Sequence, residues 1–314
     1  MAADSRGTHI KPPKFDYHAP RSLDEAVALL ARYGGDAKPL AGGQSLVPLL
    51  NFRLARPAAL IDLNRIAALS GIREVDGHVA FGAMTRQRAV EFSPIVAQRL
   101  PLLAEATRWV GHLPIRSRGT IGGSIAHADP SAEYPAVLTA LGGTVIARGQ
   151  KGERELTSTE LFESYLTTTL AADELLTEVR LPVMPAGAGW AFEEFARRHG
   201  DFAIVGVAAA IWRESGRWTA RLATAGVGPV PLRLRGAEET IARDGVGETV
   251  LAAAAADAAE LVQPDTDLHA SADYRRNLTR VLTERALRKA IARANQLSRT
   301  ADPRLEPHAP RSLQ

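Results

Sequence analysis

Ala41-Gly42-Gly43-Gln44-Ser45 and Thr120-Ile121-Gly122-Gly123-Ser124 are the two stretches that decide how this chain is expected to fold. Each places two neighbouring glycines beside a short hydroxyl side chain at the edge of an apolar run. Glycine adopts positive φ at little cost and lets the backbone approach a ligand closely. Successive exposed N–H groups in such turns bind anions such as a pyrophosphate. The stretches predict two glycine turns that together form a dinucleotide site, although either alone could be a tight turn.

The spacing of these glycines excludes the two commonest phosphate-binding motifs. It fits neither G-x-G-x-x-G nor G-x-x-x-x-G-K-[ST]. Lys38 precedes the first stretch and either adds positive charge to a phosphate cradle or is a solvated surface lysine. Asp129 follows the second stretch and is an acceptor suited to ribityl or ribose hydroxyls. These neighbours favour a dinucleotide over a simple anion.

No set of side chains has the spacing of a catalytic or metal centre. His127 has a side chain that titrates near neutral pH, but no second histidine or carboxylate stands at a partner spacing, so we interpret it as structural. H-E-x-x-H and G-x-S-x-G are both missing. We therefore assign no catalytic residue and no metal ligand to this chain.

The absence of cysteine limits what chemistry the chain can carry. With 46% hydrophobic and 23% charged residues among 314, it has the composition of a globular protein with two or three compact units. Having no cysteine, it contains no disulfide, no thiolate nucleophile and no cysteine-ligated iron–sulfur cluster. A cluster that exchanges electrons with this chain must lie on a partner.

Charge and hydropathy indicate neither a nucleic-acid partner nor a membrane. The net charge is +3 and the pI is about 9.4, but arginines and acids are interspersed and no basic run alternates with aromatics. No apolar run approaches the roughly 20 residues of a transmembrane helix. The first residues lack the apolar core of a secretory signal. We expect a cytoplasmic protein that is not integral to a membrane and binds no nucleic acid.

Hydrophobic periodicity divides the chain into a larger first part and a smaller second part. Residues 11–64 read as strand–turn–helix–strand, which predicts a small α/β unit with parallel strands. Residues 65–183 read as α+β, with a hairpin at Asp76-Gly77 and helices interrupted at Pro94 and Pro101. Residues 182–189 contain two prolines and two glycines and read as a linker.

The second part, residues 190–294, is expected to be α+β. It contains strand-like runs at 204–212 and 219–225, followed by helices at 250–262 and 272–294. Residues 1–10 and 300–314 lack periodicity and are expected to be flexible tails. We therefore predict a first domain at 11–185, with subdomains at about 11–64 and 65–183, and a C-terminal domain at 190–294.

Further motifs accompany the two glycine stretches in a regular order: Arg53-Leu-Ala-Arg-Pro57, Leu60-Ile-Asp-Leu63, Gly82-Ala-Met-Thr85, His127-Ala-Asp-Pro130, Gly200-Asp-Phe-Ala-Ile-Val-Gly206 and Ala270-Ser-Ala-Asp-Tyr-Arg275. In these motifs the chain resembles the FAD-binding, or medium, subunits of bacterial molybdenum hydroxylases, such as carbon monoxide, xanthine and nicotine dehydrogenases. The resemblance covers nearly all of residues 14–292. It implies an α+β fold: an α/β flavin domain of the vanillyl-alcohol-oxidase-like (PCMH) type in two subdomains, followed by a smaller α+β domain.

The resemblance also implies which residues bind FAD. Lys38 and the first glycine stretch would hold the pyrophosphate, the second stretch would line the other side, and Asp129 would reach the ribityl chain. Phe202 would lie near the isoalloxazine, where carbon monoxide dehydrogenases carry tyrosine, so a stacking role survives while a hydroxyl is lost. The implied cofactor-binding residues are Lys38, Ala41, Gly42, Gly43, Gln44, Ser45, Leu46, Ala83, Thr120, Ile121, Gly122, Gly123, Ser124, Asp129 and Phe202.

As a member of that family, the chain would be the electron-transfer subunit of a heteromeric enzyme. A large subunit would carry the molybdopterin cofactor and a small subunit two [2Fe–2S] clusters, in a dimer of heterotrimers. FAD in this chain would pass electrons to a terminal acceptor. Two alternatives stay open: a stand-alone flavin oxidase of the vanillyl-alcohol-oxidase-like fold, which would need its own substrate-directed groups, and a non-enzymatic basic binding module.

Overall fold

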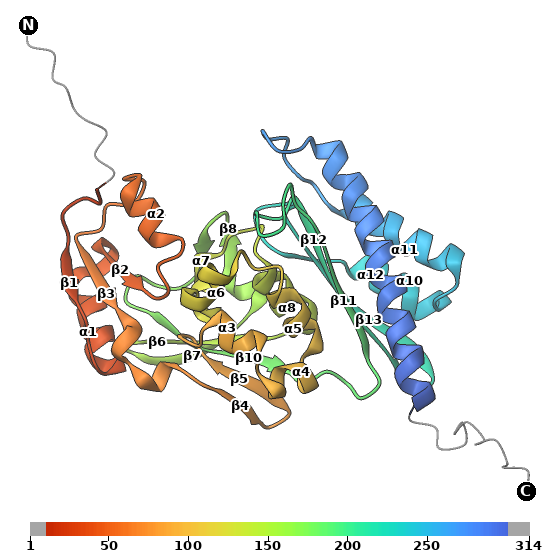
Figure 1. The fold of residues 1–314 in the computed structure, drawn as a ribbon, viewed down its shortest axis with the longest axis horizontal. Coiled ribbons are helices and arrows are strands. Elements are labelled where there is room, and N and C mark those ends of the chain that lie inside the picture. The colour runs from red at the N-terminus through yellow and green to blue at the C-terminus, as the bar shows by residue number, and fades with distance from the viewer. Residues whose placement is uncertain (1–10, 301–314) are drawn as a thin grey trace, which may run out of the picture.

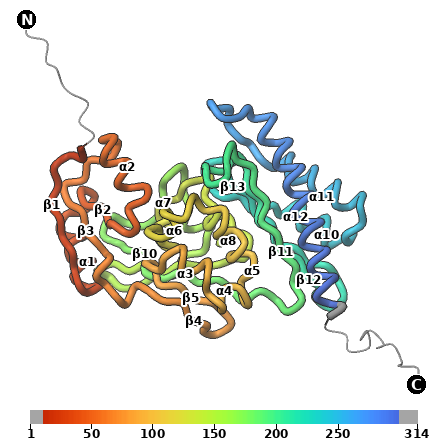
Figure 2. Tube along the Cα trace, in the orientation of Figure 1, coloured from red at the N-terminus to blue at the C-terminus, as the bar shows by residue number. Residues whose placement is uncertain are grey.

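The computed structural model describes residues 11–300, so the tails expected at 1–10 and 301–314 lie outside the described residues. Figure 1 shows three units side by side, from the N-terminal unit through a central unit to a C-terminal unit that ends in the long helix α12. Figure 2 traces the same path along the backbone. No helix within the described range is long and apolar enough to span a lipid bilayer.

The N-terminal unit is the predicted parallel α/β unit. It consists of β1 (Asp16–His18), α1 (Leu23–Tyr33), β2 (Ala37–Leu40), α2 (Leu46–Asn51) and β3 (Ala59–Asp62). Its sheet has the order β1-β3-β2, and both pairings are parallel. The Ser22 hydroxyl accepts a hydrogen bond from the Glu25 N–H at the start of α1, and Gly34, with φ +56°, ends the helix. The strand β1 was not predicted.

The central unit is built on an antiparallel sheet of order β4-β5-β10-β6-β7. Its strands are β4 (Ile72–Val75), β5 (His78–Gly82), β6 (Thr144–Gly149), β7 (Gly152–Thr157) and β10 (Leu175–Pro182). The predicted hairpin is confirmed, with positive φ at Asp76 and Gly77 as a tight two-residue turn requires. The late strand β10 inserts between the two hairpins and is buried along most of its length.

Short helices cover this sheet: α3 (Gln87–Glu91), α4 (Pro94–Arg99), α5 (Pro101–Thr107), α6 (Leu113–Arg118), α7 (Ile121–His127) and α8 (Glu133–Leu141). Pro94 and Pro101 each begin a helix, because proline at the first position loses no helical hydrogen bond. The smaller elements are α9 (Ser158–Leu161), β8 (Phe162–Ser164), β9 (Thr167–Thr168) and three single 3-10 turns, η1 (Gly34–Asp36), η2 (Leu63–Arg65) and η3 (Ala67–Leu69).

The C-terminal unit is a sheet of order β11-β12-β13-β14 backed by three helices. The elements are β11 (Gly189–Phe195), β12 (Val205–Glu214), β13 (Arg217–Ala225), β14 (Leu232–Arg233), α10 (Arg235–Asp244), α11 (Glu248–Leu261) and α12 (Ala272–Thr300). The strands β12 and β13 and the helices α11 and α12 were predicted. The strand β11 and the helix α10 were not, and α12 continues to Thr300, which the sequence had placed in a tail.

The linker prediction at 182–189 is wrong at its end, because Gly189 begins β11. A Cβ on Gly189 would lie only 1.8 Å from the carbonyl oxygen of Ala290, so this glycine allows α12 to pack closely on the strand. The sheet is buried on both faces. Ala208 and Ala210 of β12 face the central unit, while Val207 and Ala209 between them face the C-terminal helices. This alternation joins the central and C-terminal units through one shared core.

Candidate functional site

The first glycine stretch forms a loop between β2 and α2 whose backbone is open to a ligand. Within the described residues, the N–H groups of residues 42–46 donate to no protein acceptor. Gly43 has φ +73°, which a residue with a side chain rarely adopts. The only hydrogen bond within the loop runs from the Gln44 amide to the Gly42 carbonyl, at 3.1 Å. Successive free N–H groups of this kind form an anion-binding concavity.

The second glycine stretch is not the predicted turn. Residues 121–127 form the helix α7, and the Thr120 hydroxyl caps it by accepting the Gly123 N–H at 3.0 Å. The N–H groups of Ile121, Gly122 and Ser124 also donate to backbone carbonyls. These donors are therefore used within the protein and are not free to bind an anion. The sequence pattern does not separate the two structures, because a helix N-cap and a glycine turn can both begin with a hydroxyl residue such as Thr120.

The glycines of the second stretch instead allow close packing. A Cβ on Gly122 would lie 2.5 Å from the Cβ of Ala83, and the Gly122 N–H donates to the Ala83 carbonyl at 2.9 Å. A Cβ on Gly123 would lie 3.3 Å from the Cβ of Ala41 and 2.6 Å from the Thr120 hydroxyl. The structure therefore brings Ala83 and both glycine stretches together, as expected.

Through Gly42, the first glycine stretch also packs against the backbone that immediately precedes the second stretch. A Cβ at this position would lie 2.4 Å from the carbonyl oxygen of Arg118 and 2.7 Å from the Cα of Gly119. The loop after β2 thus rests on the backbone between α6 and α7, where the N-terminal unit meets the central unit (Figures 1 and 2). The predicted site residues of the two stretches therefore lie at this junction.

The remaining predicted residues lie in different environments. Lys38 is exposed on β2, and Leu46 and Ser124 are half-buried. Asp129 follows Ala128, which caps α7 with φ +52°, and one of its carboxylate oxygens accepts the Ser131 N–H at 2.9 Å. Phe202 belongs to the loop between β11 and β12 and is 72% exposed. Its ring is free to contact a ligand and packs little against the protein.

The loop that carries Phe202 is anchored to the central unit by aromatic contacts. The rings of Trp109 and His199 stack, with centroids 5.5 Å apart and planes inclined by 26°. Gly200 has φ +89°, and a Cβ there would lie 2.3 Å from the ring of His112. The geometry of this turn therefore depends on glycine, and the turn holds the loop of Phe202 at the boundary between the central and C-terminal units.

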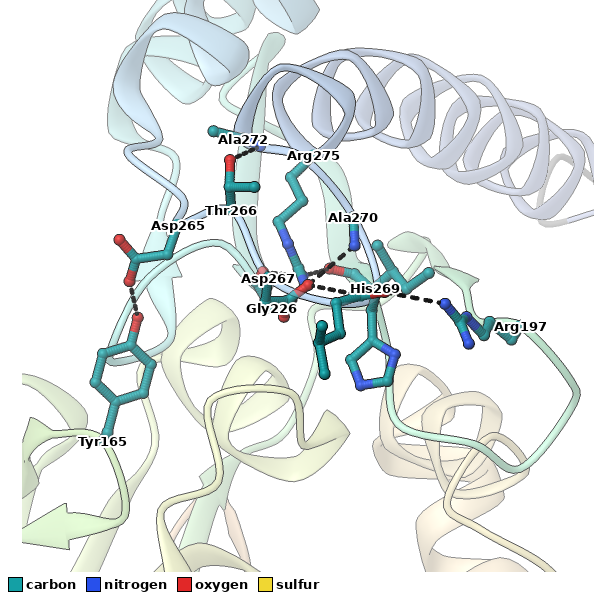
Figure 3. A network of polar contacts seen from close by, with 12 residues as sticks. Tyr165, Arg197, Gly226, Asp265, Thr266, Asp267, His269, Ala270, Ala272 and Arg275 are labelled. Carbon is teal, nitrogen blue, oxygen red and sulfur yellow. Dashed lines mark hydrogen bonds and ion pairs between the residues drawn. The ribbon is translucent and has the colours of Figure 1, made fainter.

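Arg275 ties the same loop to the start of α12 (Figure 3). Its buried guanidinium donates to the carbonyl oxygens of Ile204 and Gly226 at 2.6 and 2.8 Å, and forms an ion pair with Asp267 at 2.7 Å. Burial alone would raise the pKa of Asp267, but the hydrogen bonds from the Ala270 N–H and from Arg275 outweigh it and lower the pKa to about 2. The motif at residues 270–275 therefore has a structural role.

Two buried carboxyl groups, which no sequence motif marks, lie where the central and C-terminal units meet. Glu133 begins α8 and Glu194 lies on β11, and each is only 8% exposed. Neither carboxyl oxygen of Glu194 has a hydrogen-bond partner within the described residues. Burial, followed by the charge of Glu133, raises the pKa of Glu194 to about 9, and burial raises the pKa of Glu133 to about 7. At least one of them is protonated at neutral pH.

The junction fits the diphosphate of a dinucleotide. The loop at 42–46 supplies unused N–H donors, and Gly42 and Gly43 leave no side chain in the way. Arg86 and Arg118 lie beside the loop, and neither forms an ion pair within the described residues. Arg86 was not among the predicted site residues, because nothing in its local sequence pattern reveals a contact that the fold creates. Within residues 11–300, no group of histidine and carboxylate side chains is arranged to hold a metal.

Comparison with known proteins assigns both parts of the chain. Residues 13–184 match the family described as FAD binding domain in molybdopterin dehydrogenase, and residues 190–290 match CO dehydrogenase flavoprotein C-terminal domain. The chain is 44% identical to the 6-hydroxypseudooxynicotine dehydrogenase complex subunit alpha of Paenarthrobacter nicotinovorans, over 93% of this chain and 100% of that relative. It is 41% identical to the carbon monoxide dehydrogenase medium chain of Hydrogenophaga pseudoflava, over 90% and 99%.

Solved structures agree with these matches. The carbon monoxide dehydrogenase of Hydrogenophaga pseudoflava has a chain with a TM-score of 0.87 and 42% identity, covering 90% of this chain and 99% of that one. Quinoline 2-oxidoreductase from Pseudomonas putida 86 gives a TM-score of 0.86 at 38% identity, with the same coverage. The expected fold class, a PCMH-type FAD-binding domain followed by a smaller α+β domain, is confirmed. The chain therefore belongs to the family of FAD-binding medium subunits of molybdenum hydroxylases, which are subunits of oxidoreductases.

Proposed function

We propose that this chain holds FAD at the junction of its N-terminal and central units. The observation that carries the proposal is the row of N–H groups at residues 42–46 that have no protein acceptor. These groups, with Lys38 beside them, would bind the diphosphate. Ala83 and residues 120–124 would line the other side of the dinucleotide by close packing, because the N–H groups of residues 121–124 are used within the protein. Asp129 would accept a hydrogen bond from the ribityl or ribose hydroxyls through its second oxygen, and Phe202 would shield the flavin ring.

The proposed role is electron transfer. When bound, FAD supplies the redox chemistry, and this chain binds, orients and shields it. Since the sequence contains no cysteine, electrons would enter from [2Fe–2S] clusters on a small partner subunit, after substrate is hydroxylated at a molybdopterin cofactor on a large partner subunit. The names of the relatives as subunits and as a medium chain support this division of labour. The proposal includes a dimer of heterotrimers in the cytoplasm.

We also propose the domain boundaries that the sequence suggested, with a FAD-binding domain at 11–185 and a C-terminal domain at 190–294. The two family matches end and begin at 184 and 190, which supports this division. The shared core described above makes the two domains one packed body along the inner face of the C-terminal sheet. The loop carrying Phe202 would then bring the second domain to the cofactor of the first.

The substitution Gly43→Val tests the site. Gly43 has φ +73°, and its Cβ would lie 3.2 Å from the Val47 side chain, so valine would strain the loop and turn its N–H groups away. We expect FAD affinity of the full-length chain to fall at least about tenfold, which is about 1.4 kcal/mol. The measurement is flavin absorbance and fluorescence during titration with FAD.

Gly35→Val is the matched control, because a Cβ at Gly35 meets nothing within 4 Å and the residue lies in the same unit. Thermal unfolding of both variants without FAD separates a local effect from misfolding. An unchanged affinity in Gly43→Val would contradict the site. Full oxidase activity of the purified chain without partner subunits would favour the stand-alone flavin oxidase instead, and a chain indifferent to FAD would favour the binding module.

A further inference from the structure

Arg86 lies in the central unit, beside the start of the second glycine stretch. It follows β5 and forms an isolated antiparallel bridge with Thr120. The neighbouring Gln87 N–H donates to the Gly119 carbonyl at 2.9 Å, and the Ile121 N–H donates to the Thr85 carbonyl at 3.0 Å. The backbone of Arg86 is therefore fixed alongside the start of α7, and only its side chain extends toward the N-terminal unit.

The guanidinium of Arg86 contacts both sides of the proposed site. One nitrogen donates to the carbonyl oxygen of Arg118, the same atom against which Gly42 rests. The other donates to the side-chain oxygen of Asn64 at 2.5 Å. The Asn64 amide in turn donates to the carbonyl oxygen of Ala41 at 3.0 Å. One planar side chain thus links the first glycine stretch, through Asn64, to the Arg118 carbonyl just before the second stretch.

The charge of Arg86 is only partly balanced by the protein, through the nearby Asp62 carboxylate. Within the described residues it forms no ion pair, and the Asp62 carboxylate nearby is hydrogen-bonded to Tyr17 and Asn64. Burial, and then the charge of Arg118, lowers the pKa of Arg86 from its usual value. A half-buried guanidinium beside a second arginine is costly unless an anion accompanies it. A diphosphate bound on the adjacent N–H groups would supply that anion.

We propose that Arg86 is a positioning residue for the cofactor, which clamps the two glycine stretches at the spacing that the diphosphate requires and offsets its charge. The proposal rests on the proposed FAD site. Arg86 lies outside both glycine stretches. It would act on the position of these stretches through its links to the carbonyl oxygens of Ala41 and Arg118. Arg86 should therefore contribute to the binding affinity of any ligand that carries the diphosphate, with or without a flavin.

The variants Arg86→Gln and Arg86→Lys separate clamping from charge. Glutamine removes the charge and cannot reach both acceptors, so the Kd of the full-length chain for FAD should rise about tenfold or more. The Kd for ADP, which carries the diphosphate without the flavin, should rise by a similar factor. Lysine keeps the charge as a single point without the planar fork and should restore only part of the affinity. Asn64→Ala, which keeps Arg86 but breaks the link to Ala41, should also weaken binding.

Arg88→Gln is the control, because Arg88 lies two residues further on in α3, is exposed and contacts the ring of Phe92. It should bind FAD as the unaltered chain does, and all variants should unfold near the same temperature. Unaltered FAD affinity in both Arg86→Gln and Asn64→Ala, or full rescue by lysine, would overturn the clamp. If Gly43→Val also kept FAD, the site itself would be wrong; if only the Arg86 variants kept it, the site would stand without the clamp.

Discussion

At the scale of single residues, the structure identifies side chains whose properties depend on neighbours far away in sequence. Arg86 and Asn64 meet across the junction of two units, and Glu133 and Glu194 meet across another. A local pattern cannot reveal these contacts, because each needs the fold to bring its partners together. The glycines are different, since their own backbone requirement marks them in the sequence. This is why the sequence located both glycine stretches and missed the arginine that joins them.

The buried Glu194 makes stability depend on pH. Its pKa is about 9 in the folded chain against an ordinary value of 4.5, so folding favours the protonated form. The contribution of Glu194 to stability is therefore fully present below about pH 4.5 and is lost progressively as pH rises toward 9. Glu194→Gln removes the titrating group, so it should be more stable than the unaltered chain by about 1–3 kcal/mol at pH 8, and nearly equal at pH 4.5.

Chemical denaturation at a series of pH values measures this difference. Glu163→Gln is the control, because Glu163 is exposed on β8. It should leave the pH profile of unfolding unchanged. A Glu194→Gln variant whose advantage does not grow between pH 5 and pH 8 would show that the carboxyl group is not held protonated.

At the scale of elements, most of the secondary structure follows from periodicity and from turn residues. The parallel N-terminal unit, the hairpin at Asp76-Gly77 and the helices that begin at Pro94 and Pro101 agree with prediction. The second glycine stretch shows the limit. Its two glycines suggested a turn, but Thr120 caps a helix and the glycines serve close packing against Ala83. Helix and turn share the same opening residues, so only the packing partners distinguish them.

The cap on α7 gives a prediction at this scale. Thr120 is 2% exposed, and its hydroxyl accepts the Gly123 N–H. Thr120→Ala should lower the free energy of unfolding by about 1 kcal/mol, because that donor loses its partner. Thr120→Ser keeps the hydroxyl and should cost less. Equal stabilities of the alanine and serine variants in urea denaturation would mean that the cap contributes nothing.

At the scale of the whole molecule, the three units pack into one body with two junctions. The first lies between the N-terminal and central units, and the second lies between the central and C-terminal units. The first junction holds the open loop at 42–46, and the second carries Phe202 on a loop that Arg275 and the Trp109–His199 stack hold in place. Arg293 of α12 reaches across the second junction to Glu105 of α5, at 2.5 Å. The cofactor that the family binds would therefore be held by residues from all three units, which no single motif defines.

The most direct test of the account is the distribution of flavin and metals among the subunits. The tagged full-length chain is purified from the cells that produce it, its flavin, iron and molybdenum are measured, and its subunits are then separated under mild conditions. The account predicts equimolar FAD that stays with this chain, while iron and molybdenum leave with two other polypeptides. A chain that holds no FAD even when FAD is supplied, or one that retains the iron, would contradict it.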